Sequence, residues 1–143
     1  MKKYFLSVLL LTAVLILAGC QYVPYGLPEE PIVFKSGEFY PDNDDSGYRT
    51  VEYDDKVYIM YGGIKAIGLL RDISYACGVC LGYVEDDESE RIYALVNEST
   101  DEWLIEYYVG GIMEQPIVLR EISAKDNDRI PGSVEAFDYE YWK

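Results

Sequence analysis

Beyond residue 33, hydrophobic and polar positions alternate along the chain in short runs that end at acidic residues or glycine. In Tyr48–Tyr53, for example, Val51 falls on one face of an extended strand and Glu52 on the other. Asp54-Asp55 has the length and composition of a hairpin turn, and a second apolar run, Lys56–Tyr61, follows it. Alternation with a period of two favours half-buried strands, so we expect a mainly β protein.

Four further runs with this character are expected to be strands: Val79–Val84, Arg91–Val96, Trp103–Val109 and Pro116–Ile122. In the third, the odd-numbered residues form one apolar face opposite Glu106. The fourth begins with proline, which cannot donate a ladder hydrogen bond, so we expect it at a sheet edge. Gly62-Gly63 is expected to end the strand before it, and the polar segments 85–90 and 97–102 are expected to be solvated loops. The run 64–73 is ambiguous between a short helix and another strand.

The end of the chain predicts one short helix. Pro131 and Gly132 precede Ser133, which can act as the N-cap, and Glu135 would lie in the first turn. With the short connections between strands, this predicts a small antiparallel meander sheet or partial barrel with a short C-terminal helix.

The N-terminus has a different pattern. Lys2 and Lys3 precede a nearly unbroken apolar run of 14 residues, Tyr4–Leu17. That length matches the hydrophobic region of a secretion signal and falls short of the roughly 20 residues of a membrane-spanning helix. The sequence Leu17-Ala18-Gly19-Cys20 follows, and the whole segment resembles the signal peptide and lipobox of bacterial lipoproteins.

This resemblance implies that the sulfur of Cys20 carries a diacylglycerol and that a dedicated peptidase cuts just before it. Each buried methylene of an acyl chain contributes about 0.8 kcal/mol, so two or three chains, palmitate for example, would hold the protein firmly on a membrane. The implied location is extracytoplasmic, at the cell membrane or the outer membrane. Gln21 stands where an aspartate would retain a lipoprotein at the inner membrane. It implies outward sorting in a bacterium with two membranes, and the plasma membrane in one with a single membrane.

The chain is expected to divide into three segments. Residues 1–19 form the signal peptide. Residues 20–35 hold the lipidated cysteine and three prolines, which favour a semi-stiff extended tether. Residues 36–143 form one acidic, β-rich globular domain, because the 124 residues left after cleavage suffice for one domain and not two.

Composition narrows the choice of partners and chemistry. Removing residues 1–19 takes away Lys2 and Lys3 and no acidic residue, so the formal net charge falls from −14 to −16. Nucleic acid is therefore a poor partner, because its binding depends on neutralising phosphates. The chain has no histidine. This excludes a Ser-His-Asp triad, a Cys-His pair and the common zinc sites.

Cys77-Gly78-Val79-Cys80 is a CxxC motif. With Cys20 lipidated, these two cysteines make an even pair in an oxidising compartment, where a disulfide can form. Residues three apart on a flat strand lie about 10 Å apart, so a Cys77–Cys80 disulfide would need a turn at Gly78-Val79. The alternatives are buried thiols, a redox site and a metal site.

Asp42-Asn43-Asp44-Asp45-Ser46-Gly47 has the D-x-D-x-S-G spacing of calcium loops. Oxygen ligands at alternate positions, here Asp42, Asp44 and Ser46, converge on one ion, and the glycine permits the sharp turn. The glutamate required at loop position 12 is replaced by Tyr53, and the flanking segments look like strands. A plain acidic turn is the alternative.

These observations favour a lipid-anchored, non-enzymatic binding or interaction module of the bacterial envelope, since no catalytic signature is present. Its partners would be the membrane, through the lipid on Cys20, and an envelope protein or small ligand. The alternatives are an envelope thiol/disulfide redox module at Cys77 and Cys80, or a calcium-dependent structural module. Calcium is the one cofactor that the sequence suggests.

Overall fold

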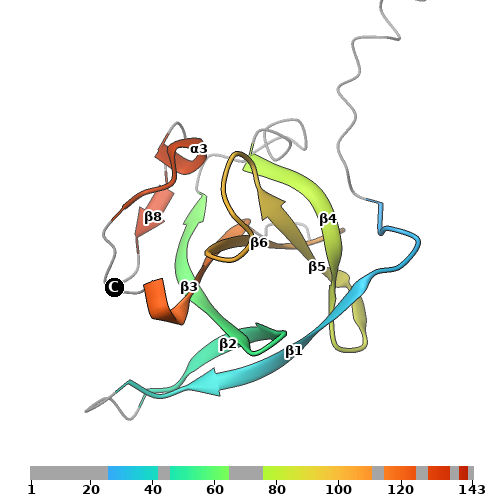
Figure 1. Ribbon diagram of the computed structural model, residues 1–143, viewed down its shortest axis with the longest axis horizontal. Helices are drawn as coiled ribbons and strands as arrows, with labels where there is room; N and C mark the ends of the chain where they lie inside the picture. The colour runs from blue at the N-terminus through green and yellow to red at the C-terminus, as the bar shows by residue number, and fades with distance from the viewer. Residues whose placement is uncertain are drawn as a thin grey trace, which may run out of the picture.

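The computed structural model describes residues 26–41, 46–64, 76–110, 115–124, 129–135 and 139–141. The elements in these ranges are β1 (Ile32–Phe39), β2 (Tyr48–Tyr53), β3 (Lys56–Ile64), β4 (Cys77–Val84), β5 (Asp87–Leu95), β6 (Trp103–Tyr108), β7 (Ile117–Glu121), the 3-10 turn η1 (Ile122–Ala124), the helix α3 (Gly132–Glu135) and β8 (Tyr139–Tyr141). Figure 1 shows the strands arranged around a central axis.

The first seven strands close into a barrel. β1, β2 and β3 form one antiparallel meander, and β4 to β7 form another. The meanders join twice, through an antiparallel pair between β3 and β7 and a parallel pair between β1 and β4. β8 pairs with the far end of β3. The predicted fold, mainly β with a barrel-like sheet and a short helix near the C-terminus, is confirmed, and one parallel pair completes the closure.

Two pairs of neighbouring strands, β2–β3 and β4–β5, are connected by tight turns. Asp54 and Asp55 have φ angles of 50° and 62°, the left-handed values of a type I′ turn, and they join β2 to β3 as predicted. Glu85 and Asp86 make a similarly short turn between β4 and β5. The prediction of a loop over 85–90 is wrong beyond these two residues, because β5 already begins at Asp87.

Two further predictions fail where a strand has neighbours on both sides. Gly62-Gly63 does not end β3, because these residues pair with β7 on one side and β8 on the other. β7 is internal and not an edge strand, since β6 and β3 flank it. Pro116 lies just before β7, where its missing N–H interrupts no ladder.

The two ends of the domain also differ from expectation. Ile32–Lys35, assigned to the tether, form the first half of β1. Helix α3 begins at Gly132, two residues before the start that an N-cap at Ser133 would give, because the carbonyl of Pro131 accepts the N–H groups of Val134 and Glu135. Ser133 therefore lies inside the helix and is not its N-cap. Most of the ambiguous run 64–73 lies outside the described residues.

The barrel interior is filled by one apolar side chain from each of its seven strands. These residues are Phe34, Val51, Tyr58, Val84, Ile92, Leu104 and Leu119. None is more than 4% exposed. The alternation seen in the sequence thus directs one face of every strand inward.

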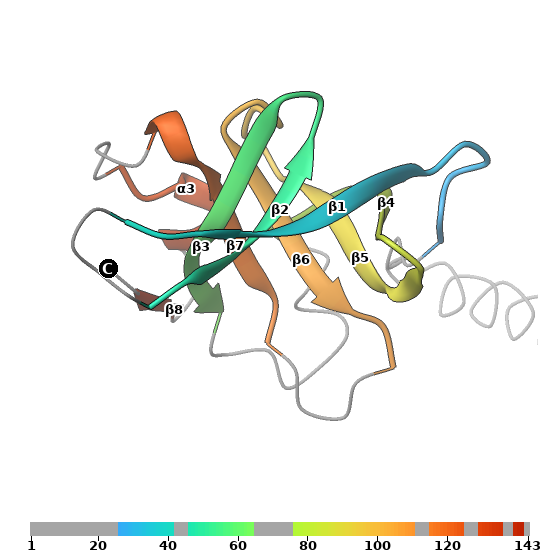
Figure 2. The ribbon, with the colours of Figure 1, turned by 90° about the horizontal axis from the view of Figure 1, so that it is seen from below.

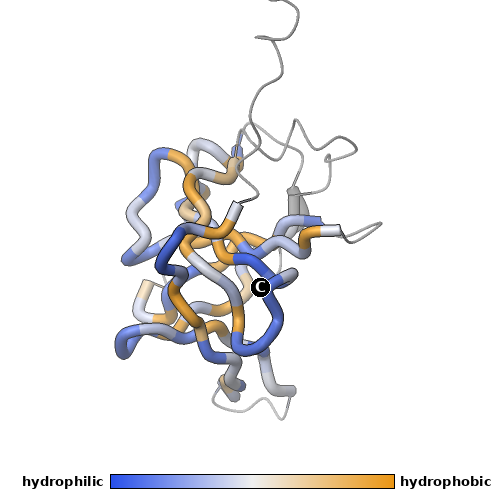
Figure 3. Tube along the Cα trace, turned by 90° about the vertical axis from the view of Figure 1, so that its right-hand side faces the viewer, coloured by the Kyte–Doolittle hydropathy of each residue, from blue (hydrophilic) through white to orange (hydrophobic). Residues whose placement is uncertain are grey.

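A second apolar layer covers the outside of one wall. Trp103, Ile105 and Tyr107 of β6 face this layer, as predicted for the odd-numbered residues, and Val134 of α3 packs on it. The ring of Tyr61 meets Trp103 edge-on at 5.0 Å between centroids. Figure 3 shows hydrophobic segments gathered towards the middle of the described chain and hydrophilic ones mostly at its outer bends. β6 is therefore buried on both faces, which places the even-numbered Glu106 inside the protein.

Candidate functional site

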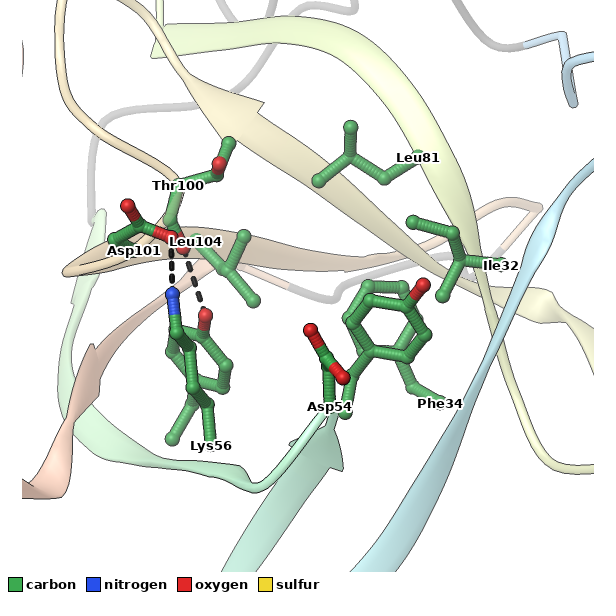
Figure 4. Close-up of a pocket in the computed structure, with 10 residues that line it drawn as sticks. Ile32, Phe34, Asp54, Lys56, Leu81, Thr100, Asp101 and Leu104 are labelled. Carbon is green, nitrogen blue, oxygen red and sulfur yellow. Dashed lines mark hydrogen bonds and ion pairs between the residues drawn. The ribbon is translucent and has the colours of Figure 1, made fainter.

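One mouth of the barrel holds an apolar cavity of about 150 Å³, termed the cup. Its apolar wall consists of Ile32, Phe34, Tyr53, Tyr58, Leu81 and Leu104. Its rim consists of Asp54, Lys56, Thr100 and Asp101. Figure 4 shows side chains from β1 and β4 on one side of the cup and those from β3 and the loop before β6 on the other.

The polar groups of the cup are largely paired with one another. Lys56 Nζ forms an ion pair with Asp101 Oδ1, and the hydroxyl of Tyr58 donates to the carbonyl of Thr100 at 2.7 Å. Burial, reinforced by nearby carboxylates, raises the pKa of Tyr58 to about 12, so this hydroxyl keeps its proton at physiological pH. The cup therefore offers an incoming group an apolar wall beneath a polar rim whose groups are largely engaged.

The size and lining of the cup suit one small apolar group. The rings of Phe34 and Tyr53 lie 5.4 Å apart at 52°, and Tyr53 remains 45% exposed at the opening. An engineered cavity of about 150 Å³ with leucine, isoleucine and phenylalanine walls binds benzene. An aromatic ring or a branched aliphatic side chain therefore has the size to occupy the apolar wall of the cup.

A buried ion cluster lies further inside the barrel. Arg49 of β2 forms ion pairs with Glu90 of β5 and, at 2.7 Å, with Glu106 of β6, while the hydroxyl of Tyr108 donates to Glu90. Along β6, Leu104 lines the cup, and Glu106 follows two residues later on the same inward face. The cluster thus occupies the end of the interior away from the cup.

Glu106 is the most buried acid of this cluster, with 1% of its surface exposed. Burial raises the pKa of its carboxyl, and the charge and hydrogen bond of Arg49 act in the opposite direction. Its Oε2 atom has no hydrogen-bond partner among the residues that the structure describes. The ionised form of Glu106 therefore depends on Arg49.

A second cavity, of about 330 Å³, lies outside this cluster, between the β4–β5 turn and β1, and is termed the acidic notch. It is lined by Ser36, Arg49, Val84, Glu85, Asp86, Asp87 and Glu90. The only basic side chain in this lining is that of Arg49, against four carboxylates. The barrel therefore has an apolar cavity at one end and a negatively charged one at the other.

Cys77 and Cys80 both lie in β4 as buried free thiols. Irregular pairing with β5 on either side of Cys80 lets both sulfurs face the outer apolar layer, while Val79 between them is 66% exposed. Burial raises the pKa of Cys77 to about 12 and also raises that of Cys80, so both are weak nucleophiles at neutral pH. The disulfide, redox and metal roles stay predictions.

Only some of the other predicted site residues belong to the described part of the chain. Cys20, Asp42 and Asp44 lie outside the described residues, and Ser46 is exposed. Calcium binding and lipidation therefore stay predictions. Among the residues that the structure describes, no group of three or more acids or cysteines is placed to hold a metal ion. No helix within the same ranges is long and apolar enough to cross a membrane.

Sequence reasoning missed the cup and the buried ion cluster. The cup draws on strands and loops from Ile32 to Leu104, so no local motif marks it. The cluster had one usable signal, which is the charge of Glu106 in the middle of the apolar run Trp103–Tyr108. A charged residue in such a run predicts a buried partner of opposite sign.

We compared the chain with models of protein families, with curated proteins and with solved structures, and none of the three comparisons gave a match.

Proposed function

We propose that this chain is a lipid-anchored protein of the bacterial envelope that binds a partner through the cup. The observation that carries the binding role is the cup itself, an open cavity with an apolar wall and a polar rim at the mouth of a closed barrel. A monomer normally fills or covers such surface, and concave apolar sites with a few polar groups at the rim are the usual form of ligand sites.

The pairing inside the cup favours binding over chemistry. Lys56 is engaged by Asp101, and the Tyr58 hydroxyl is engaged by a backbone carbonyl and holds its proton. Neither group is free to act as a general base or a nucleophile at neutral pH. The partner is therefore expected to contribute an aromatic or branched aliphatic group, either as a protein side chain or as part of a small ligand.

Membrane attachment through Cys20 is the second half of the proposal and rests on the lipobox-like segment. An anchored domain meets its partners at the surface of one membrane, which raises their effective concentration. A modest contact area such as the cup then suffices for specific association.

Photo-crosslinking on intact cells tests the cup. We expect p-benzoylphenylalanine in place of Tyr53, at the opening, to capture one defined partner, identified by mass as a protein or a small molecule. The same residue in place of Val79, exposed on the outer wall, should not capture it. Thr100→Trp, which blocks the rim, should lower the Tyr53 yield about tenfold, the effect of losing about 1.4 kcal/mol of binding. Equal yields from the two positions, or indifference to Thr100→Trp, would refute a binding role for the cup.

A further inference from the structure

Among the residues that the structure describes, no strand lies beside one edge of β1 over half of its length. The first three residues of β1 pair with β4, whereas Lys35–Phe39 pair with β2 on the opposite edge. Figure 2 shows β1 lying across the front of the barrel. No other strand of the described chain pairs with β1 beyond Phe34 on the side of β4. This edge is termed the open edge.

The direction of the backbone groups along the open edge follows from the strand geometry. The carbonyl of Phe34 accepts the N–H of Glu85 at 2.8 Å on this edge, so Ser36 and Glu38, two and four residues later, direct their backbone groups to the same side. The N–H of Ser36 donates to Oε1 of Glu85 at 3.1 Å. A carboxylate oxygen thus stands where the carbonyl of an added strand would stand, and the carbonyl of Ser36 and both groups of Glu38 follow it.

The acidic notch adjoins this open edge through Ser36. Its one cation, Arg49, is already shared by the buried carboxylates of Glu90 and Glu106. Glu85 and Asp86 on the turn and Asp87 at the start of β5 therefore meet no cation among the lining residues. Carboxylates of one sign around a concave site produce a negative potential that attracts a cation.

We propose that the open edge of β1 and the acidic notch together bind an extended basic segment of a partner protein. The main chain of that segment would add to β1 at the carbonyl of Ser36 and at both backbone groups of Glu38, beyond the Ser36 N–H that Glu85 occupies, and a lysine or arginine side chain would enter the notch. Strand addition supplies main-chain hydrogen bonds, and pockets for alternate side chains supply specificity. Because alternate side chains of a strand point to one face, the fitting segment carries basic residues at every second position.

The negative charge of this surface favours a basic segment as its occupant. The mature chain has a net formal charge of −16, and the notch has three carboxylates that no lining cation neutralises. An acidic segment would be repelled, and a neutral one would leave the notch carboxylates unpaired. This surface is separate from the cup, so it stands or falls independently of the binding role proposed there.

The test uses the mature lipidated protein, residues 20–143, in nanodiscs of zwitterionic lipid with empty nanodiscs as the blank, and in this respect it rests on the lipid anchor of the proposed function. The probe is a fluorescent eight-residue peptide of alternating lysine and threonine, followed by anisotropy. We expect saturable binding that weakens with salt. A peptide with glutamate in place of lysine should not bind, and one with N-methylated backbone amides along its edge should bind at least about tenfold more weakly.

Matched variants separate the two parts of the surface. Asp86→Lys in the notch should weaken binding about tenfold, while Glu135→Lys, an equal charge change on exposed α3, should have little effect. Glu38→Pro removes an N–H on the open edge, so this variant should bind the peptide much more weakly than Glu38→Ala does. Absence of binding, equal affinity for the N-methylated peptide, or equal effects within either pair of variants would overturn the proposal.

Discussion

Replacing Gly82 by alanine is expected to destabilise the domain by about 3 kcal/mol, the upper part of the range for overpacked sites. An added Cβ would stand 1.8 Å from the carbonyl oxygen of Ile32 and 2.7 Å from its N and C atoms. All three are backbone atoms, so no side chain can move aside. Ile32 and Gly82 are paired in the parallel ladder that closes the barrel, and the substitution should push β1 away from β4.

Thermal unfolding followed by circular dichroism measures this effect, which should lower Tm by about 10 °C for a domain of this size. Gly132→Ala is the matched control, because nothing lies within 4 Å of its Cβ position. Its free energy of unfolding should change by less than about 1 kcal/mol. If the two alanine variants have the same Tm, β1 and β4 do not approach each other closely at Gly82.

Replacing Arg49 by methionine is expected to cost about 3 kcal/mol of stability at pH 7, the lower end of the range for breaking a buried pair. The lower end applies because the Arg49 side chain is still 33% exposed. The substitution keeps the apolar stem but leaves Glu90 and the fully buried Glu106 without their cation. Lys56→Met removes an ion pair whose partner Asp101 is 78% exposed and should cost no more than about 1 kcal/mol.

The Arg49→Met deficit should depend on pH in a defined direction. Burial places the pKa of Glu106 in the folded state above its ordinary value of 4.5, and loss of Arg49 should raise it further. An acid with a raised folded-state pKa destabilises the folded state fully at pH values above that pKa. The destabilisation disappears at pH values below the pKa of the unfolded state, because the group is then protonated in both states. Acidification from pH 7 towards 4.5 should therefore bring Arg49→Met closer to the parent protein.

Chemical denaturation at several pH values measures this recovery. Adding Glu106→Gln to Arg49→Met should restore stability at pH 7 and reduce the pH dependence, because glutamine carries no charge to bury. A loss of stability that is constant from pH 7 to 4.5, or an Arg49→Met variant no less stable than Lys56→Met, would show that the buried ion cluster does not form.

The local structure of this domain could be predicted because its signals are local. The run Tyr48–Tyr53 is β2 without change, since its alternation matches a strand that is half buried. Asp54 and Asp55 mark their turn because aspartate tolerates left-handed backbone. The same local rules fail at Gly62-Gly63, where hydrogen bonds to strands on both sides outweigh the weak strand preference of glycine.

The closure of the barrel and its sites could not be predicted in this way. Closure depends on Ile32 meeting Gly82, fifty residues apart, and Gly82 looks like any other glycine in a run of hydrophobic residues. Glu90 belongs to a polar stretch that resembles a loop, yet Arg49 draws it into the interior. The cup likewise forms only when β1 to β6 are assembled, so no spacing along the chain encodes it.

Lipid attachment at Cys20 is the central claim about where this protein acts, and metabolic labelling with palmitate tests it most directly. The full-length protein would be expressed in a bacterial host that processes lipoproteins, beside Cys20→Ala. We expect label on the parent protein, an N-terminus at Cys20 by mass spectrometry, and retention in the membrane fraction, with all three lost in the variant. An unlabelled parent protein, or one that keeps residues 1–19, would contradict the account.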